Sequence, residues 1–246
     1  MPQAWEITTT DERSEDQITT FIIFCEDQND EPIYFRSFQI ENKLKINCIP
    51  NQKKAKINLL NTLSACLNDG LMDCINNIYQ IKKDVTENIW CVYDRDLEDI
   101  NLLNIKQLHE LEFTTAITMA TQSGLKVAWS NDAFELWVLL HFEQVPIGNK
   151  FHRNYIYDRL TEILKVKPSV YQAYSDLIDN NVFNYKTHLK RRQAFLTYIL
   201  PILKSKTSIA IENAIILEKN YNGNIPYHDW NPCTMVHRLV KDILDT

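Results

Sequence analysis

The sequence predicts an α/β protein in which a parallel sheet flanked by helices is followed by a mainly helical C-terminal region. Over residues 19–145, short apolar runs alternate with longer segments of helical spacing. Such alternation implies right-handed crossovers between parallel strands. Over residues 146–246 the strand pattern fades and long helical periodicities remain, so this region should be mainly helical and pack on the first. Residues 1–18 are expected to form a polar tail.

Four apolar runs are the expected strands of the sheet. They lie at residues 19–26, 44–50, 88–94 and 125–131. Helices are expected at residues 31–43, at 55–83 as two helices broken near Asp69 and Gly70, and at about 105–123, ending before Gly124. Pro32 fits the first turn of its helix, where a missing N–H group costs little.

The helical region should begin after a soft boundary near residues 145–150, where Pro146 and Gly148 break the pattern. No low-complexity linker separates the two halves, so we expect them to pack together. Near the end, in the segment NPCTMVHRLV, Asn231 or Thr234 is expected to cap a helix. The side chains expected to pack inward from that helix are Val236, Leu239 and Val240.

Composition limits the classes of function. The formal net charge of -6 argues against a protein that coats nucleic acid with a globally basic surface, although it leaves a local groove open. No run approaches the roughly 18 apolar residues that cross a bilayer, and the polar start does not resemble a signal peptide, so we expect a cytoplasmic protein. The six cysteines include no CxxC pair and are expected to be reduced. Neither a P-loop nor a dinucleotide fingerprint occurs.

Carboxylates follow two of the predicted strands. Glu26 ends the run FIIFCE, and Asp94 and Asp96 end the run IWCVYDRD. Ligands of open α/β sheets bind beyond the carboxyl ends of the strands, so the three acids should converge on one crevice. In an extended segment, Asp94 and Asp96 would point the same way. Clustered carboxylates of this kind suit Mg²⁺ or Mn²⁺.

This arrangement of acids resembles the Toprim fold of topoisomerases, primases and OLD-type nucleases. The sequence around these acids is more specific and resembles that of the RloB family of Toprim-related abortive-infection proteins. It comprises, in order, FCEDQNDEPIYF, VYDRD, SNDAFELWVLLHF and NPCTMVHRLV, and the resemblance covers roughly residues 19–244. Such proteins are commonly encoded beside an ATPase.

The resemblance implies site residues only where the positions match. Glu26 fits the glutamate at the end of the first strand, and Asp94 with Asp96 fits the DxD motif. Two further segments match the family. The helix start EPxYF contributes Glu31, Pro32, Tyr34 and Phe35, and the helix FELWxLLHF contributes Phe134, Glu135, Trp137, His141 and Phe142. The chain departs from the family in the first turn, where Asp27 and Asp30 stand in place of the usual Gly and Thr.

Three further candidates each have a structural alternative. Glu135 is expected either to join the site or to stabilise the start of its helix, which Ser130 or Asp132 would cap. His141 has apolar neighbours, which favours a hydrogen-bonded core histidine over a residue that contacts substrate. Lys186 is expected to be a helix-surface lysine rather than a phosphate contact.

Together these features predict a Mg²⁺-dependent or Mn²⁺-dependent nuclease of anti-phage abortive infection, controlled by an ABC-type or AAA-type ATPase encoded nearby. Glu26, Asp94, Asp96 and Glu135 would be catalytic, and the first three would bind the metal. The sequence leaves open whether RNA or DNA is cut and whether the chain forms a homo-oligomer. The alternatives are a non-catalytic interaction module of the ATPase and, less favoured, a haloacid-dehalogenase-like phosphatase with a DxD motif.

Overall fold

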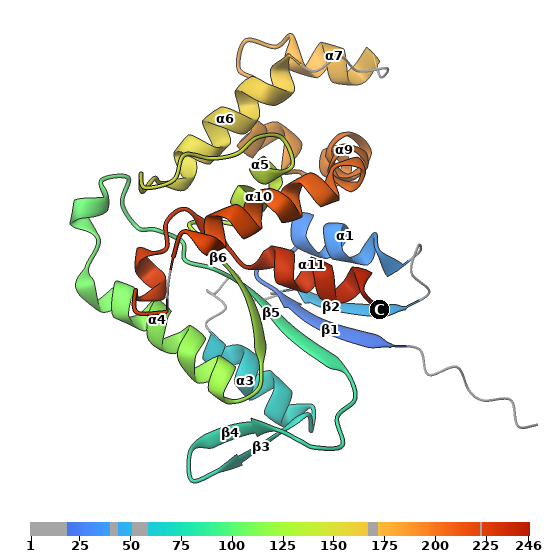
Figure 1. Ribbon diagram of the computed structural model, residues 1–246. Coiled ribbons are helices and arrows are strands. Elements are labelled where there is room, and N and C mark those ends of the chain that lie inside the picture. Colours follow the sequence, from blue (N-terminus) through green and yellow to red (C-terminus); the bar gives the residue numbers. More distant parts are fainter. Residues whose placement is uncertain (1–18, 40–43, 51–58, 167–171, 222) are drawn as a thin grey trace, which may run out of the picture.

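The computed structural model describes residues 19–39, 44–50, 59–166, 172–221 and 223–246. Within these residues the chain forms a five-stranded, mostly parallel sheet with helices on both faces and a helical C-terminal region (Figure 1). The predicted α/β class is therefore confirmed. The predicted polar tail, residues 1–18, lies outside the described residues.

The strand order of the central sheet is β2-β1-β5-β6-β7. These strands are β1 (Thr20–Cys25), β2 (Lys45–Pro50), β5 (Asn88–Asp94), β6 (Lys126–Asn131) and β7 (Cys233–Thr234). The first four pair in parallel, whereas β7 runs antiparallel to β6. All four predicted strands are present, with ends that shift by at most one residue, because their apolar side chains are buried against the helices. In the edge strand β2 this holds for one face only, since Lys45 and Asn47 are exposed.

Successive side chains of β1 enter opposite layers, as the pleat of a strand requires. Phe21 and Ile23 join a core with α1 (Asp30–Arg36), α5 (Glu135–Leu140), α10 (Thr207–Lys219) and α11 (Val236–Leu244). Phe24 joins a second core with α3 (Leu59–Asn68) and α4 (Gln107–Gln122). Figure 1 shows the two helical layers on either side of the sheet. The first core also contains Leu239, so the two halves of the chain share one apolar interior.

The prediction of two helices over residues 55–83 is wrong in its second part. Helix α3 ends at Asn68, and Gly70 then takes a positive φ of 74°. The chain continues as an antiparallel hairpin of β3 (Met72–Ile75) and β4 (Ile78–Ile81). Asn76 and Asn77 both have positive φ, which is the backbone of a two-residue hairpin turn. The spacing of three residues between the isoleucines at the strand ends imitates a helix, although they face each other across the turn.

Helix α1 ends at Arg36, well before the predicted end at residue 43, and residues 40–43 lie outside the described part of the chain. The predicted start of the next helix, at residue 55, also lies outside it. Helix α4 begins at Gln107 and ends before Gly124, whose φ of 87° stops it as predicted.

The C-terminal half is mainly helical, as predicted. Its further helices are α6 (Arg153–Lys165), α7 (Gln172–Ile178), α8 (Arg192–Ala194) and α9 (Leu200–Ser205), with single π-helical turns at Tyr185–Leu189 and Phe195–Ile199. Among the described residues, no single helix has the length and apolar character needed to cross a bilayer. One pair, Arg192–Ser205 with Thr207–Lys219, meets those criteria only when taken together and is bent by 72°.

One strand in the C-terminal half escapes prediction because it has only two residues. Strand β7 extends the sheet beyond β6, and the Thr234 hydroxyl bonds the Ser130 hydroxyl at 3.0 Å. Thr234 Oγ1 also accepts the N–H of Val236 at 3.3 Å, at the start of α11. Asn231 does not cap that helix, because its amide exchanges hydrogen bonds with the backbone of Phe151. The helix buries Val236, Leu239 and Val240, as predicted.

Candidate active site

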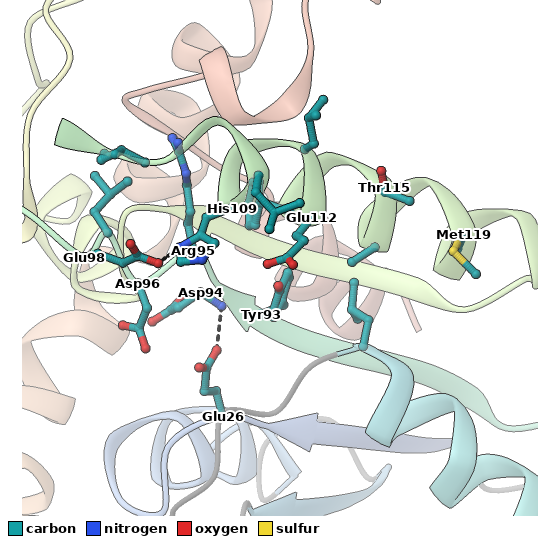
Figure 2. A pocket seen from close by; sticks show the side chains of 17 residues that line it. Glu26, Tyr93, Asp94, Arg95, Asp96, Glu98, His109, Glu112, Thr115 and Met119 are labelled. Atoms are coloured by element: carbon teal, nitrogen blue, oxygen red, sulfur yellow. Dashed lines mark hydrogen bonds and ion pairs between the residues drawn. The ribbon is translucent and has the colours of Figure 1, made fainter. Parts of the chain in front are cut away.

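The candidate site lies where the order of the sheet reverses. From β1 the chain crosses to β2 on one side, whereas β5 pairs on the other side of β1. The loops that follow β1 and β5 therefore diverge and leave a crevice at their carboxyl ends. Glu26 follows β1, and Asp94 is the last residue of β5. Together with Asp96, both line a pocket of about 710 Å³ (Figure 2).

Glu26 connects the two strand ends. Its Oε2 accepts the backbone N–H of Asp94 at 2.7 Å, and Figure 2 shows this carboxylate directed at the end of β5. The turn that carries Glu26 is fixed by Glu31, a buried residue of α1. One oxygen of Glu31 accepts the N–H groups of Glu26 at 2.7 Å and Asp27 at 3.1 Å. The glutamate of the EPxYF segment therefore fixes the loop that presents Glu26.

Asp94 combines burial with an incomplete set of hydrogen bonds. Its Oδ2 accepts the N–H of Phe134 at 2.8 Å, whereas its buried Oδ1 has no hydrogen-bond partner. Burial, followed by the charges of Glu26 and Glu31, raises the pKa of Asp94 well above its ordinary value. A carboxylate that is desolvated, surrounded by like charge and short of one donor is stabilised by a cation.

The predicted strand geometry of the DxD motif is wrong at its second acid. Strand β5 ends at Asp94, and Asp96 has a positive φ of 53°, so the two acids are not successive members of one face of a strand. Asp96 instead forms an ion pair with Arg153. Arg153 is anchored by the fully buried Asp132, whose Oδ2 accepts its backbone N–H at 2.9 Å and its Nε–H at 3.1 Å.

Glu135 is fully buried and faces a lysine from the helical half. Its Oε1 lies 2.6 Å from the ammonium nitrogen of Lys190, which also lies 3.6 Å from a carboxylate oxygen of Asp27 and 3.8 Å from one of Asp30. Burial lowers the pKa of Lys190, but the charges of Glu135 and Asp30 outweigh it and leave that pKa well above its ordinary value. Lys190 therefore stays charged.

Neither predicted cap of α5 is observed. No side chain of Ser130 or Asp132 caps this helix, and the N–H of Phe134 that precedes it is bound by Asp94 instead. Glu135 also contributes to the raised pKa of Asp94 through its charge. Glu135 is not among the residues that line the pocket with Glu26, Asp94 and Asp96, and its carboxylate pairs with Lys190.

Neither of the two candidate substrate contacts is among the residues that line the pocket. His141 is fully buried, with Nδ1 2.8 Å from the carbonyl oxygen of Trp137 and Nε2 3.3 Å from the Tyr34 hydroxyl. This placement agrees with the core-histidine alternative rather than with substrate contact. The ammonium group of Lys186 lies 5.3 Å from the ring centroid of Tyr157, a cation–π contact on the surface of the helical half.

Sequence reasoning missed the basic residues that neutralise the acids. Lys190 belongs to the basic segment KTHLKRR, but only Lys186 of that segment was a candidate. Arg153 belongs to no recognisable motif, and Asp132, in the segment SNDAFELWVLLHF, was expected only as a helix cap. Both basic residues are far from their acidic partners in the chain, with 57 positions between Asp96 and Arg153, so no local pattern could reveal the pairing.

The residues present fit a hard divalent cation through the chemistry of their donors and through the open Oδ1 of Asp94. Asp94 and Asp96 would hold such an ion, with Glu26 beside them. Over the described ranges, no three His, Cys, Asp or Glu side chains are already grouped as a metal site. Ligation would therefore require the carboxylates to adjust around Asp94.

Fold and site together define an α/β protein with an acidic pocket at the switch point of its sheet. Comparison with protein families places the chain more closely. The family model described as RloB-like protein matches residues 21–243. The chain belongs to the RloB-like protein family. Searches of curated proteins and of solved structures found no match.

Proposed function

We propose that this RloB-like protein is a metal-dependent nuclease of the Toprim type that acts in anti-phage abortive infection. The main support is the state of Asp94, which is half-buried among carboxylates and whose buried Oδ1 has no hydrogen-bond donor. Uncompensated negative charge costs stability unless a cation is bound, so its presence at a pocket mouth points to a functional site. Membership of the RloB-like family supports the same proposal.

The roles follow from the contacts of each acid. Asp94 and Asp96 would hold the ion, while Glu26 would bind it as well or move a proton at the attacking water. Glu135 lies behind Asp94 and would act on it through charge, because its own carboxylate is buried against Lys190. When bound, Mg²⁺ or Mn²⁺ would offset the negative charge of the phosphodiester and make a coordinated water more acidic.

In this proposal the protein works in the cytoplasm on RNA or DNA and is restrained by an ABC-type or AAA-type ATPase encoded nearby. A nuclease with access to millimolar Mg²⁺ needs restraint, and the chain carries no P-loop of its own. The family resemblance suggests the ATPase as the source of that control.

A second candidate is a non-catalytic interaction module of the same ATPase. One observation favours it: Asp96, half of the DxD motif, is neutralised by Arg153. The described residues also hold no ready group of three metal ligands. In such a module the acids would be retained to support the fold around Arg153 and Lys190 rather than for chemistry.

Cleavage assays separate the two candidates. Purified protein, with and without the ATPase, should cut at least one of single-stranded RNA, structured RNA, single-stranded DNA and duplex DNA in Mg²⁺ or Mn²⁺ but not in EDTA. Asp94→Asn should lose cleavage, because it removes the charge that holds the cation. Glu112→Gln provides a matched control, since this exposed carboxylate lies on α4 in the wall of the same pocket (Figure 2).

Cleavage by the wild type and by Glu112→Gln, but not by Asp94→Asn, would support the nuclease. Equal cleavage by Asp94→Asn and the wild type would indicate a contaminating nuclease and contradict the assignment. Complete inactivity across the panel in the presence of the ATPase and its nucleotide would favour the non-catalytic module.

A further inference from the structure

Arg153, the first residue of α6, reaches from the helical half of the chain to the loop that carries the DxD motif. Its guanidinium forms an ion pair with Asp96 and donates to the carbonyl oxygen of Leu97 at 3.2 Å. We propose that Arg153 is a positioning residue, which orients the Asp96 carboxylate for a divalent cation. This inference rests on the proposed function, since it assigns a role within the same site.

Arg153 is itself held rigidly by Asp132. The fully buried Asp132 carboxylate lies 3.0 Å from Nη2 of Arg153 and also accepts its Nε–H and backbone N–H. The same carboxylate accepts the N–H of Leu97 at 2.6 Å, and the Asp132 carbonyl accepts the N–H of Asp96 at 3.1 Å. One acid therefore fixes both the arginine and the backbone of the loop that the arginine contacts.

The contact with Asp96 is additional to what neutralising Arg153 requires. Asp132 already supplies a buried counter-charge at hydrogen-bonding distance. Asp96, by contrast, has a side chain that is 34% exposed and lines the pocket with Asp94. An arginine that served only the fold would have no need of this second, partly exposed acid.

The printed contact between Arg153 and Asp96 uses Oδ1 of the carboxylate, and the side chain of Asp96 lines the pocket. One oxygen of Asp96 is therefore fixed by Arg153, which leaves Oδ2 for a cation. Carboxylates that bind metals are commonly oriented in this way by an outer partner, whose loss weakens metal affinity. Arginine suits the task because its planar group can bond Asp132 and Asp96 at once, which a lysine ammonium does less well.

The test compares Arg153→Gln with Arg159→Gln. Arg159 lies on the same helix and pairs with Glu143 at 2.6 Å and with Glu162, away from the pocket, so its loss controls for removing one positive charge from α6. The melting temperature of each full-length variant is first measured in EDTA and then titrated with Mg²⁺ and with Mn²⁺. The readout is the apparent dissociation constant of the cation, called the midpoint below, which is fitted from the rise of the melting temperature with cation concentration.

Arg153→Gln should raise that midpoint about 10-fold or more, within the range known for outer partners of metal ligands, whereas Arg159→Gln should leave it unchanged. Arg153→Lys keeps the charge and guards against loss of the fold; it should also raise the midpoint, because it cannot bond both acids. In an Asp96→Asn background, Arg153→Gln should have no further effect on the midpoint.

Arg153→Gln and Arg153→Lys with wild-type midpoints would overturn the inference and reduce Arg153 to a structural anchor. A tighter midpoint in Arg153→Gln would also overturn it, because Arg153 would then compete with the cation. In both cases a wild type that responds to Mg²⁺ and cleaves would leave the proposed function standing. A wild type that neither responds nor cleaves would overturn the proposed function and this inference with it.

Discussion

The carboxylate of Glu26 accepts the backbone N–H of Asp94 at 2.7 Å, across 68 positions of the chain. One side chain thus joins the ends of two neighbouring parallel strands. Because the bond uses the backbone of Asp94, the carboxylate of Asp94 is left to face Phe134 on one side and the pocket on the other. We therefore expect substitutions of these acids that remove the charge but keep the shape, such as Glu26→Gln, to change cleavage or cation binding.

Glu26→Gln should separate folding from activity. The glutamine carbonyl can still accept the N–H of Asp94, so the free energy of unfolding should change by less than about 1 kcal/mol. Cleavage should fall at least about 100-fold, the usual contribution of a residue that moves a proton, and host toxicity should be lost. Urea unfolding and cleavage rates measure the two effects. A variant that cuts as fast as the wild type would show that Glu26 only shapes the turn.

Divalent cations should stabilise the wild type by relieving repulsion around Asp94. At ten times the dissociation constant the gain is about 1.4 kcal/mol, and EDTA should reverse it. The double variant Asp94→Asn with Asp96→Asn should gain nothing from Mg²⁺. Thermal melting in EDTA and in Mg²⁺ tests this. Asp99→Asn, which removes a half-exposed acid of the following loop, should behave as the wild type does. An undiminished Mg²⁺ shift in the double variant would move the cation away from these two acids.

In the absence of a cation, the single substitution Asp94→Asn should stabilise the folded protein. The raised pKa of Asp94 means that the charged form is disfavoured in the folded protein, so removing the charge at pH 7 should stabilise the fold. We therefore expect Asp94→Asn to melt above the wild type in EDTA. A lower melting temperature would mean that contacts which aspartate makes and asparagine cannot make outweigh the repulsion.

Lys190→Met should destabilise the protein by about 3 kcal/mol or more, because it leaves the buried carboxylates of Glu135 and Asp30 without their cation. Lys186→Met is the matched control, since it removes a charge from the same segment but only a cation–π contact worth under about 1 kcal/mol. Urea denaturation gives both values. Adding Glu135→Gln to Lys190→Met should recover part of the loss, and two purely additive effects would argue against a direct pair.

His141 should make stability depend on pH. Burial lowers its pKa from 6.5 to about 4, so the folded state holds it neutral while the unfolded state protonates. Its contribution is complete above pH 6.5 and is lost as pH falls towards 4, by about 3 kcal/mol in total. The stability difference between the wild type and His141→Gln should therefore shrink by this amount from pH 7 to pH 4. Parallel pH profiles would show that folding does not lower the pKa of His141.

The expected ATPase complex can be tested on the whole chain. Co-expression with an ATPase from a neighbouring gene should yield one species by size-exclusion chromatography, with slowed hydrogen exchange in helices of the C-terminal half. Deleting residues 150–246 is a poor test, because it also removes Arg153, Lys190 and β7. Separate elution with and without ATP would favour a nuclease that acts alone.

Much of the fold follows from local patterns that the sequence displays. The apolar runs around Phe21 and Trp90 predict buried strands, and their order predicts that Glu26 and Asp94 end neighbouring ones. The hairpin at Asn76 and Asn77 is missed because a helical and a two-residue-turn arrangement place isoleucines at the same spacing. Strand β7 is missed because two residues carry no periodicity.

The site is only half predictable for a related reason. Carboxylates at strand ends are visible in the sequence, since the strand itself marks their position. The cations that pair with them are set by how α6 and the π-helical turn at Tyr185–Leu189 pack on the sheet, which no local pattern encodes. Burial of Glu135 and Asp132 is likewise a product of packing, so the sequence left the role of Glu135 open and suggested only a helix cap for Asp132.

Strand β7 has a consequence for the order of events during synthesis. Its Thr234 bonds Ser130 of β6 across 104 positions, so the sheet is completed only after most of the chain has left the ribosome. In the sequence, Arg153 and Lys190 lie between β6 and β7. A nascent chain therefore contains Asp96 and Glu135 before the basic residues that pair with them have been synthesised. Contacts this distant in sequence also slow folding. A chain that is terminated before residue 190 therefore has an acidic crevice without Lys190.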